Sequence, residues 1–153
     1  MNGAAGTSFL WISLLMVVAG IGIPLMATLS SGLGQALQSP VAATAIMFGG
    51  GLVLTLGILA FTGVPSGERL ASASPGFYFG AIFLVLYGLS ITWAAPRIGL
   101  GNAIFFVLFG QIIAAAAIDH FGLWGAIQSS ITLKRVAGIV LMLVGVYLAR
   151  KTV

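Results

Sequence analysis

Few side chains in this sequence could do chemistry, and three of them lie close together. The 153-residue chain has two acidic residues and one histidine. Asp119 stands directly before that histidine, His120, and an amide, Gln111, precedes both. A carboxylate and an imidazole can exchange protons, and an amide can bind a polar solute. We therefore predict that the stretch 110–125 is the functional centre.

Two roles are open for each of these groups. Asp119 could be a proton-coupling carboxylate, because an acid at the end of a long apolar run is costly and usually has a purpose. Alternatively it is structural and pairs with Arg135 or Lys134 in the following loop. His120 either titrates near neutral pH or serves as a hydrogen-bonded loop residue. Gln111 either joins two helices or contacts a ligand.

Several classes of function are excluded. The chain has no cysteine and too few other ligands for a metal site. It shows no P-loop and no serine in a nucleophile-elbow context near His120, so we expect neither a cofactor nor enzymatic catalysis. Its six basic residues are scattered rather than gathered in a patch, and we expect no nucleic acid as partner.

The elements that must position these groups are membrane-spanning helices. The chain is 60% hydrophobic and only 5% charged, whereas soluble domains have about 25% charged residues. We predict one all-α domain over 1–153, embedded in the bilayer. Its five transmembrane helices are expected at 9–29, 41–61, 76–95, 102–118 and 136–149. The last is short, and flanking basic side chains that reach the interfaces would extend it.

Proline and glycine mark the expected irregularities. Pro24 removes a backbone donor and is predicted to kink or interrupt the first helix. A polar turn over 30–40 and a short link over 96–101 are expected to separate helices. The glycines at 49–51 suggest flexibility, and Gly110, four residues before Ala114, would let another helix approach closely.

The charges of the loops carry the main inference about topology. With five spans, Arg69, Lys134 and Arg135 fall on one side of the membrane, and Arg97, Arg150 and Lys151 on the other. An excess of basic residues normally fixes the cytoplasmic side, and here both sides have three. We therefore predict insertion in both orientations and an antiparallel dimer, the two-chain equivalent of an inverted repeat. If the fifth segment did not cross, this balance would disappear.

One set of motifs resembles a known family. The motifs are Ala95-Pro96-Arg97-Ile98-Gly99, Gly110-Gln111, Ile118-Asp119-His120-Phe121-Gly122 and Arg135-Val136-Ala137-Gly138. Their combination and spacing resemble the YdcZ family of the drug/metabolite transporter superfamily.

This resemblance implies a five-span, multi-pass protein of the bacterial inner membrane that exports a small molecule. It also implies a homodimer of opposite orientations or a pair with an oppositely oriented paralogue. The family commonly has Gln and Asn in the second half of the first span. This chain has Met26 and Ser30 there, which suggests either a different solute or one half of a heteromeric pair.

The leading hypothesis is a secondary-type small-molecule exporter with a substrate path at the dimer's midplane. Small multidrug transporters use a carboxylate in the first span, and this first span has none. A neutral, weakly polar or zwitterionic solute therefore fits best. The alternative is a non-transporting scaffold or accessory subunit of another membrane protein, and a passive channel ranks third. The substrate-path candidates are Gln111, Tyr87, Trp93, Ser30 and Asn102.

Overall fold

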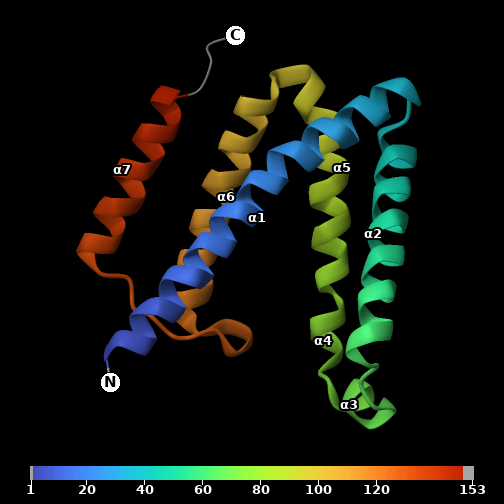
Figure 1. Ribbon diagram of the computed structural model, residues 1–153. Coiled ribbons are helices and arrows are strands. Elements are labelled where there is room, and N and C mark those ends of the chain that lie inside the picture. Colours follow the sequence, from blue (N-terminus) through green and yellow to red (C-terminus); the bar gives the residue numbers. More distant parts are fainter. Residues whose placement is uncertain (1, 150–153) are drawn as a thin grey trace. The chain divides into compact units, whose positions relative to one another are not determined.

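The computed structural model describes the backbone of residues 2–149. Every regular element in this range is a helix, as predicted (Figure 1). The chain divides into two compact units, Met1–Arg97 and Ile98–Val153. Four helices are long and apolar enough to cross a membrane: Ser8–Ala36, Pro40–Thr62, Pro75–Ile98 and Leu100–Phe121.

The first unit contains three long helices and two short ones. The long helices are α1 (Asn2–Ala36), α2 (Pro40–Thr62) and α5 (Gly80–Ile98). The segment between α2 and α5 is not a plain loop, because it forms α3 (Gly67–Ser72) and α4 (Pro75–Tyr78). The first and second spans run in opposite directions and are joined by a tight turn (Figure 1).

The second unit consists of α6 (Leu100–Phe121), the 3₁₀ turn η1 (Leu123–Gly125) and α7 (Leu133–Ala149). Gly122 ends α6 in the left-handed conformation at φ 60°, which glycine adopts without steric cost. The 17 residues of α7 measure about 25 Å at a rise of about 1.5 Å per residue. This is shorter than the hydrocarbon core of about 30 Å.

The predicted end of the first helix, at residue 29, is wrong. The helix continues through both serines of the expected turn and ends at Ala36. Ser30 and Ser31 are buried, at 4% and 7% exposure. The actual turn uses Gln38 at φ 50° and Ser39, whose hydroxyl accepts a hydrogen bond from Ala42 N as an N-cap.

Neither proline interrupts its helix. Pro24 lies inside α1, contrary to the predicted interruption, and its carbonyl accepts a bond of 2.9 Å from Thr28 Oγ1. Pro96 lies inside α5, so the predicted link over 96–101 is reduced to Gly99 at φ 84°. The carbonyls that lose their helical donor are those of Gly20 and Thr92, four residues before each proline, and transmembrane helices tolerate such prolines. The kink at Pro24 stays a prediction.

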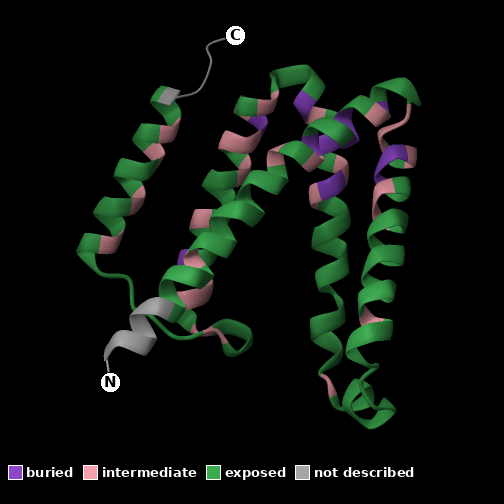
Figure 2. Ribbon diagram, viewed as in Figure 1, coloured by how far each residue is buried: buried purple, intermediate pink, exposed green. Residues whose placement is uncertain are grey.

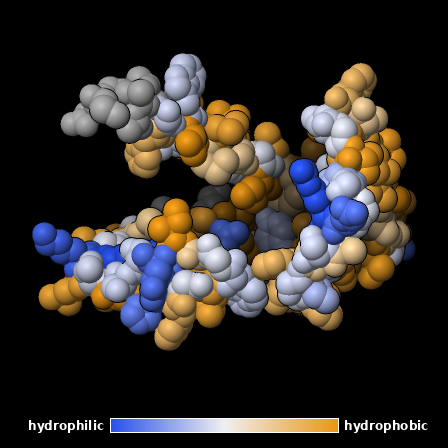
Figure 3. All heavy atoms as spheres, turned by 90° about the horizontal axis from the view of Figure 1, so that it is seen from below, coloured by the Kyte–Doolittle hydropathy of each residue, from blue (hydrophilic) through white to orange (hydrophobic). Residues whose placement is uncertain are grey.

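The buried residues of the first unit gather towards the α1–α2 turn (Figure 2). Away from this region the helices expose large apolar side chains, as expected of surfaces that face lipid. Figure 3 shows hydropathy from below, with apolar residues mixed with residues of intermediate hydropathy and the most hydrophilic residues in a few patches.

The closest helix contact involves a glycine other than those predicted. A methyl group at Gly88 on α5 would lie 2.5 Å from Phe48 Cζ and 3.1 Å from Thr44 Cγ2, both on α2. By contrast, no described neighbouring atom lies within 4 Å of a methyl group built at Gly49, Gly50, Gly51 or Gly110. Packing by these four glycines therefore remains a prediction about contacts outside the described chain.

Candidate functional site

Three buried hydroxyl groups join α1, α2 and α5. Ser30 Oγ lies 2.5 Å from Thr92 Oγ1, and Thr44 Oγ1 lies 3.4 Å from Thr92 Oγ1. Thr44 also donates to the carbonyl of Pro40 over 2.9 Å. All three residues are at most 4% exposed. We call Ser30, Thr44 and Thr92 the hydroxyl cluster.

Two glycines allow the helices to come this close. A methyl group at Gly34 on α1 would meet Thr92 Cγ2 at 3.0 Å, and one at Gly88 would meet Thr44 Cγ2 at 3.1 Å. Both glycines thus leave room for threonine methyl groups from a neighbouring helix. Small residues at helix contacts in lipid commonly have this effect.

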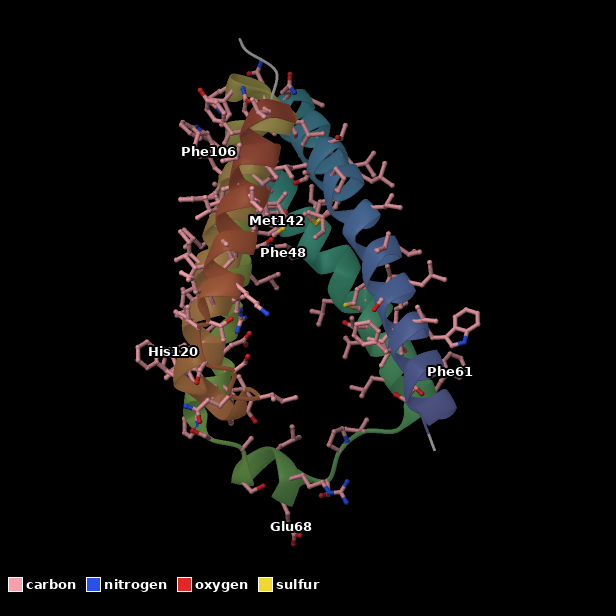
Figure 4. All side chains as sticks on the ribbon, turned by 90° about the vertical axis from the view of Figure 1, so that its left-hand side faces the viewer. Phe48, Phe61, Glu68, Phe106, His120 and Met142 are labelled. Carbon is pink, nitrogen blue, oxygen red and sulfur yellow. The ribbon has the colours of Figure 1, made fainter. Side chains whose placement is uncertain are left out.

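An apolar pocket of about 600 Å³ opens beside the hydroxyl cluster. Phe48, whose ring covers Gly88, forms part of its wall, and Figure 4 shows Phe48 well separated from Glu68 at the other end of the unit. Ser30, Thr44 and Thr55 contribute hydroxyl groups, and no charged residue lines it. The complete lining is Met26, Ser30, Thr44, Met47, Phe48, Gly51, Leu52, Thr55, Leu84 and Gly88.

The apolar pocket extends to membrane depth. Thr44 follows the start of α2 by four residues and Thr55 follows it by fifteen. At about 1.5 Å per residue these positions lie about 6 Å and about 22 Å along the helix. A hydrocarbon core is about 30 Å thick, so the apolar pocket reaches its central part.

A smaller polar pocket of about 200 Å³ lies at the end of the first unit that holds the α1–α2 turn. Gln35, Gln38 and Arg97 line it, and so does Thr92. Because Thr92 also bonds Ser30 and contacts Thr44, the hydroxyl cluster lies between the polar pocket and the apolar pocket.

The aromatic candidates lie outside the apolar pocket. Trp93 is 54% exposed, and its ring stacks under the Arg97 guanidinium at 4.2 Å. Arg97 Nη1 also donates to the Trp93 carbonyl over 2.5 Å. Tyr87 is half-buried, and its hydroxyl has no hydrogen-bond partner among the described residues. Of the predicted substrate-path residues, Tyr87 and Trp93 therefore do not line the apolar pocket of the first unit.

The acid and histidine of the predicted centre organise a loop in the second unit. Asp119 at the end of α6 forms an ion pair with Arg135 at the start of α7. Arg135 Nη1 also donates to the carbonyl of Ser129 over 3.2 Å. The ion pair with Arg135 is one of the two pairings that we predicted for a structural role of Asp119.

His120 has loop partners as well. Its Nδ1 accepts a bond of 3.3 Å from Ile131 N, and its carbonyl accepts one of 3.2 Å from Gln128 Nε2. No group of three or more potential metal ligands occurs among the residues that the structure describes. We call Asp119, His120, Gln128, Ser129 and Arg135 the loop hub.

The two amide candidates on α6 are separate from the loop hub. Gln111 is exposed and lies eight residues before Asp119, a rise of about 12 Å. Asn102 donates from Nδ2 to the Ile98 carbonyl over 2.9 Å, and its buried Oδ1 has no partner in the described part of the chain. The predicted centre over 110–125 is therefore not one site.

Comparison with known protein families identifies the chain. The family model described as "Putative inner membrane exporter, YdcZ" matches residues 11–148. The chain belongs to this family. It is thus a multi-pass inner-membrane protein of an exporter family. No curated protein and no solved structure matches the chain.

Sequence reasoning missed most of the apolar pocket in this YdcZ-family protein. It named Ser30 but neither Thr44 nor Thr92, although both interrupt strongly apolar spans. Hydroxyl residues in such spans are a usable signal, because in lipid they tend to bond across helices or to their own backbone. The sequence does not show which hydroxyls meet, since Ser30 and Thr92 are 62 residues apart.

Proposed function

We propose that this protein is a secondary-type exporter of an uncharged, weakly polar small molecule. The apolar pocket between α1, α2 and α5 is its solute path, and an antiparallel dimer is its working form. The observation that carries the proposal is an apolar pocket of about 600 Å³ with buried hydroxyls at its wall. Binding sites for small molecules are typically apolar cavities with a few placed polar groups.

The lining argues for an uncharged solute. No acid or base lines the apolar pocket, and an unpaired charge in such surroundings is costly. The sequence has no P-loop, so we expect a gradient rather than nucleotide hydrolysis to drive the flux. Membership of an inner-membrane exporter family supports export as the direction.

The first test measures solute binding directly. We expect uncharged solutes from a chemically varied panel to raise the melting temperature of the purified protein. The variant Met47→Trp fills the apolar pocket and should remove this effect. The control is Val53→Trp, because Val53 also belongs to α2 but is 69% exposed and does not line the pocket. Solutes should still raise the melting temperature of this variant. Stabilisation by a partner protein alone would instead support the scaffold alternative.

The dimer proposal includes α7 as a fifth span. It is supported by the equal distribution of basic residues over the two sets of loops. Lys134 and Arg135 lie in the first turn of α7, and side chains of this length can reach the interface from a short helix. Arg150 and Lys151, which complete the balance, lie outside the described residues.

Cysteine labelling tests the topology, because the natural chain has no cysteine. In the proposed dimer Gln38→Cys, in the α1–α2 turn, and Ser66→Cys, before α3, are each labelled from both sides of the membrane by an impermeant maleimide. Thr152→Cys, beyond the described residues, reports whether α7 crosses. Labelling of each position from one side only contradicts the antiparallel homodimer.

Gln111 of α6 is a further proposed contact of the solute. Its side chain is exposed in the isolated chain, and an amide in a membrane span needs a polar partner. We expect Gln111→Leu to abolish transport and to leave the dimer intact in chemical crosslinking. Loss of the dimer would show instead that Gln111 joins two helices.

A further inference from the structure

Arg97 has a charge that no acidic side chain of the described residues balances. The sequence contains two acidic residues. Asp119 is paired with Arg135, and Glu68 lies in α3, beyond the end of α2 that is remote from the α1–α2 turn (Figure 1). The 23 residues of α2 measure about 35 Å, which is several times the screening length of about 8 Å in physiological salt. An anion that balances Arg97 therefore comes from outside the described chain.

The guanidinium of Arg97 belongs to the polar pocket at the end of the first unit. Arg97 lies in the last turn of α5 and lines this pocket together with Gln35 and Gln38. One of its five N–H groups donates to the Trp93 carbonyl, which leaves four without another described partner. Gln35 and Gln38 are exposed, and each amide adds two N–H donors. Such donors suit the oxygens of a phosphate group.

An open apolar groove of about 480 Å³ begins beside the polar pocket. The two share Pro40, and the ring of Trp93, which lines the groove, lies under the Arg97 guanidinium at 4.2 Å. The groove continues along α5 to Leu89, eight residues and thus about 12 Å before Arg97. The remaining lining residues are Val41 and Ser90. A cationic pocket at the helix ends therefore continues into an apolar groove that runs along the membrane helices.

We propose that the polar pocket and the groove together bind a phospholipid with an anionic headgroup. The headgroup phosphate lies against Arg97, and one acyl chain lies in the groove beside Trp93. Tryptophan at helix ends is typical of the membrane interface, and basic pockets between membrane helices bind anionic headgroups. A zwitterionic headgroup carries its own cation and balances Arg97 less well, and a free phosphate ester would leave the groove unused. The lipid site is separate from the proposed solute path, because the apolar pocket shares no lining residue with it.

Brominated lipids test the proposal, because bromine on an acyl chain quenches the fluorescence of a tryptophan that it contacts. The chain has three tryptophans, and the variant Trp11→Phe with Trp124→Phe keeps only Trp93. Phosphatidylglycerol, which is anionic, and phosphatidylcholine, which is zwitterionic, are brominated on identical chains and titrated into the purified protein in a neutral detergent. We expect phosphatidylglycerol to reach half-maximal quenching of Trp93 at an about fivefold lower concentration.

Two controls separate the site from general attraction. Arg97→Gln should remove the preference, whereas Arg69→Gln, which removes the same charge from α3 and from neither lining, should keep it. The second control uses Trp11, which is 71% exposed on α1, as the only tryptophan in the variant Trp93→Phe with Trp124→Phe. Quenching of Trp11 should show a smaller preference that Arg97→Gln leaves unchanged.

Several results would overturn the proposal. An equal preference in Arg97→Gln and Arg69→Gln would show attraction by the net charge of the protein rather than a site. Displacement of the brominated lipid by soluble glycerol 3-phosphate at equal concentration would show a site for free phosphate esters. If Glu68→Gln disrupts the crosslinked dimer as Arg97→Gln does, the anion at Arg97 is the partner's Glu68. Equal preferences at Trp93 and Trp11 with Arg97 intact would also contradict the lipid site, and this comparison needs no substitution in the polar pocket.

Discussion

The hydroxyl cluster and the loop hub hold polar groups in different ways. The loop hub contains Asp119 and His120, whose side chains bond to Arg135 at the start of α7 and to Ile131 N in the loop. The hydroxyl cluster is uncharged, joins three helices and lies beside a pocket. The comparison shows that the most reactive side chains here shape the chain, whereas ordinary hydroxyls face the space that a solute could occupy.

Filling the apolar pocket should have the largest effect on transport. At Gly88 even a methyl group would meet the Phe48 ring, so Gly88→Leu should force that ring into the pocket. We expect transport to fall at least tenfold, which corresponds to about 1.4 kcal/mol. Gly80→Leu, in the same helix, meets no described atom within 4 Å of its Cβ and should leave transport unchanged. Equal losses in both variants would contradict the proposed path.

Two neighbouring glycines on α2 provide a finer test. Gly51 lines the apolar pocket and Gly50 does not, and neither meets a described neighbour within 4 Å of an added Cβ. Gly51→Leu should reduce solute efflux from proteoliposomes about threefold, a cost of about 0.7 kcal/mol, because the new side chain can partly rotate away. Gly50→Leu should have no effect on efflux. If Gly50→Leu instead disrupts the crosslinked dimer, the glycines at 49–51 lie in the contact between the two chains.

The loop hub should respond in stability rather than in transport. Asp119 and Arg135 are 36% and 29% exposed, and exposed ion pairs contribute up to about 1 kcal/mol. Arg135→Leu should therefore lower the melting temperature modestly, while transport per folded molecule stays the same. Exchange of the two charges in Asp119→Arg with Arg135→Asp should restore part of the stability. A loss of transport in Asp119→Asn at unchanged stability would show that the carboxylate couples protons.

The smallest effect is expected at His120. Its Nδ1 accepts one long hydrogen bond from the backbone of Ile131, which is worth about 1 kcal/mol or less. His120→Asn keeps an acceptor near this position, so we expect little change in melting temperature and the same pH dependence of transport. A shifted pH profile would place His120 in the transport cycle and would remove the distinction between the two regions.

Composition alone predicts much of this fold, but helix ends and the site depend on contacts across the chain. Apolar runs indicate the four long spans, whose ends differ from the prediction mainly at Ser30 and Pro96. A serine is as compatible with a turn as with a buried position in a membrane helix. Here Ser30 is buried inside a helix, and its hydroxyl bonds to Thr92, which is 62 residues away in the sequence. The same long-range contact creates the hydroxyl cluster, so sequence reasoning found Ser30 without its partners.

The hydrogen bond from Thr44 to the Pro40 carbonyl has a consequence for biogenesis. Because donor and acceptor belong to the same helix, Thr44 is satisfied before α5 has been synthesised. An unpaired hydroxyl in the hydrocarbon core costs free energy, and a back-bonded threonine avoids that cost. α2 can therefore enter the bilayer with the Thr44 hydroxyl already hydrogen-bonded, and the hydroxyl cluster is completed only when α5 brings Thr92.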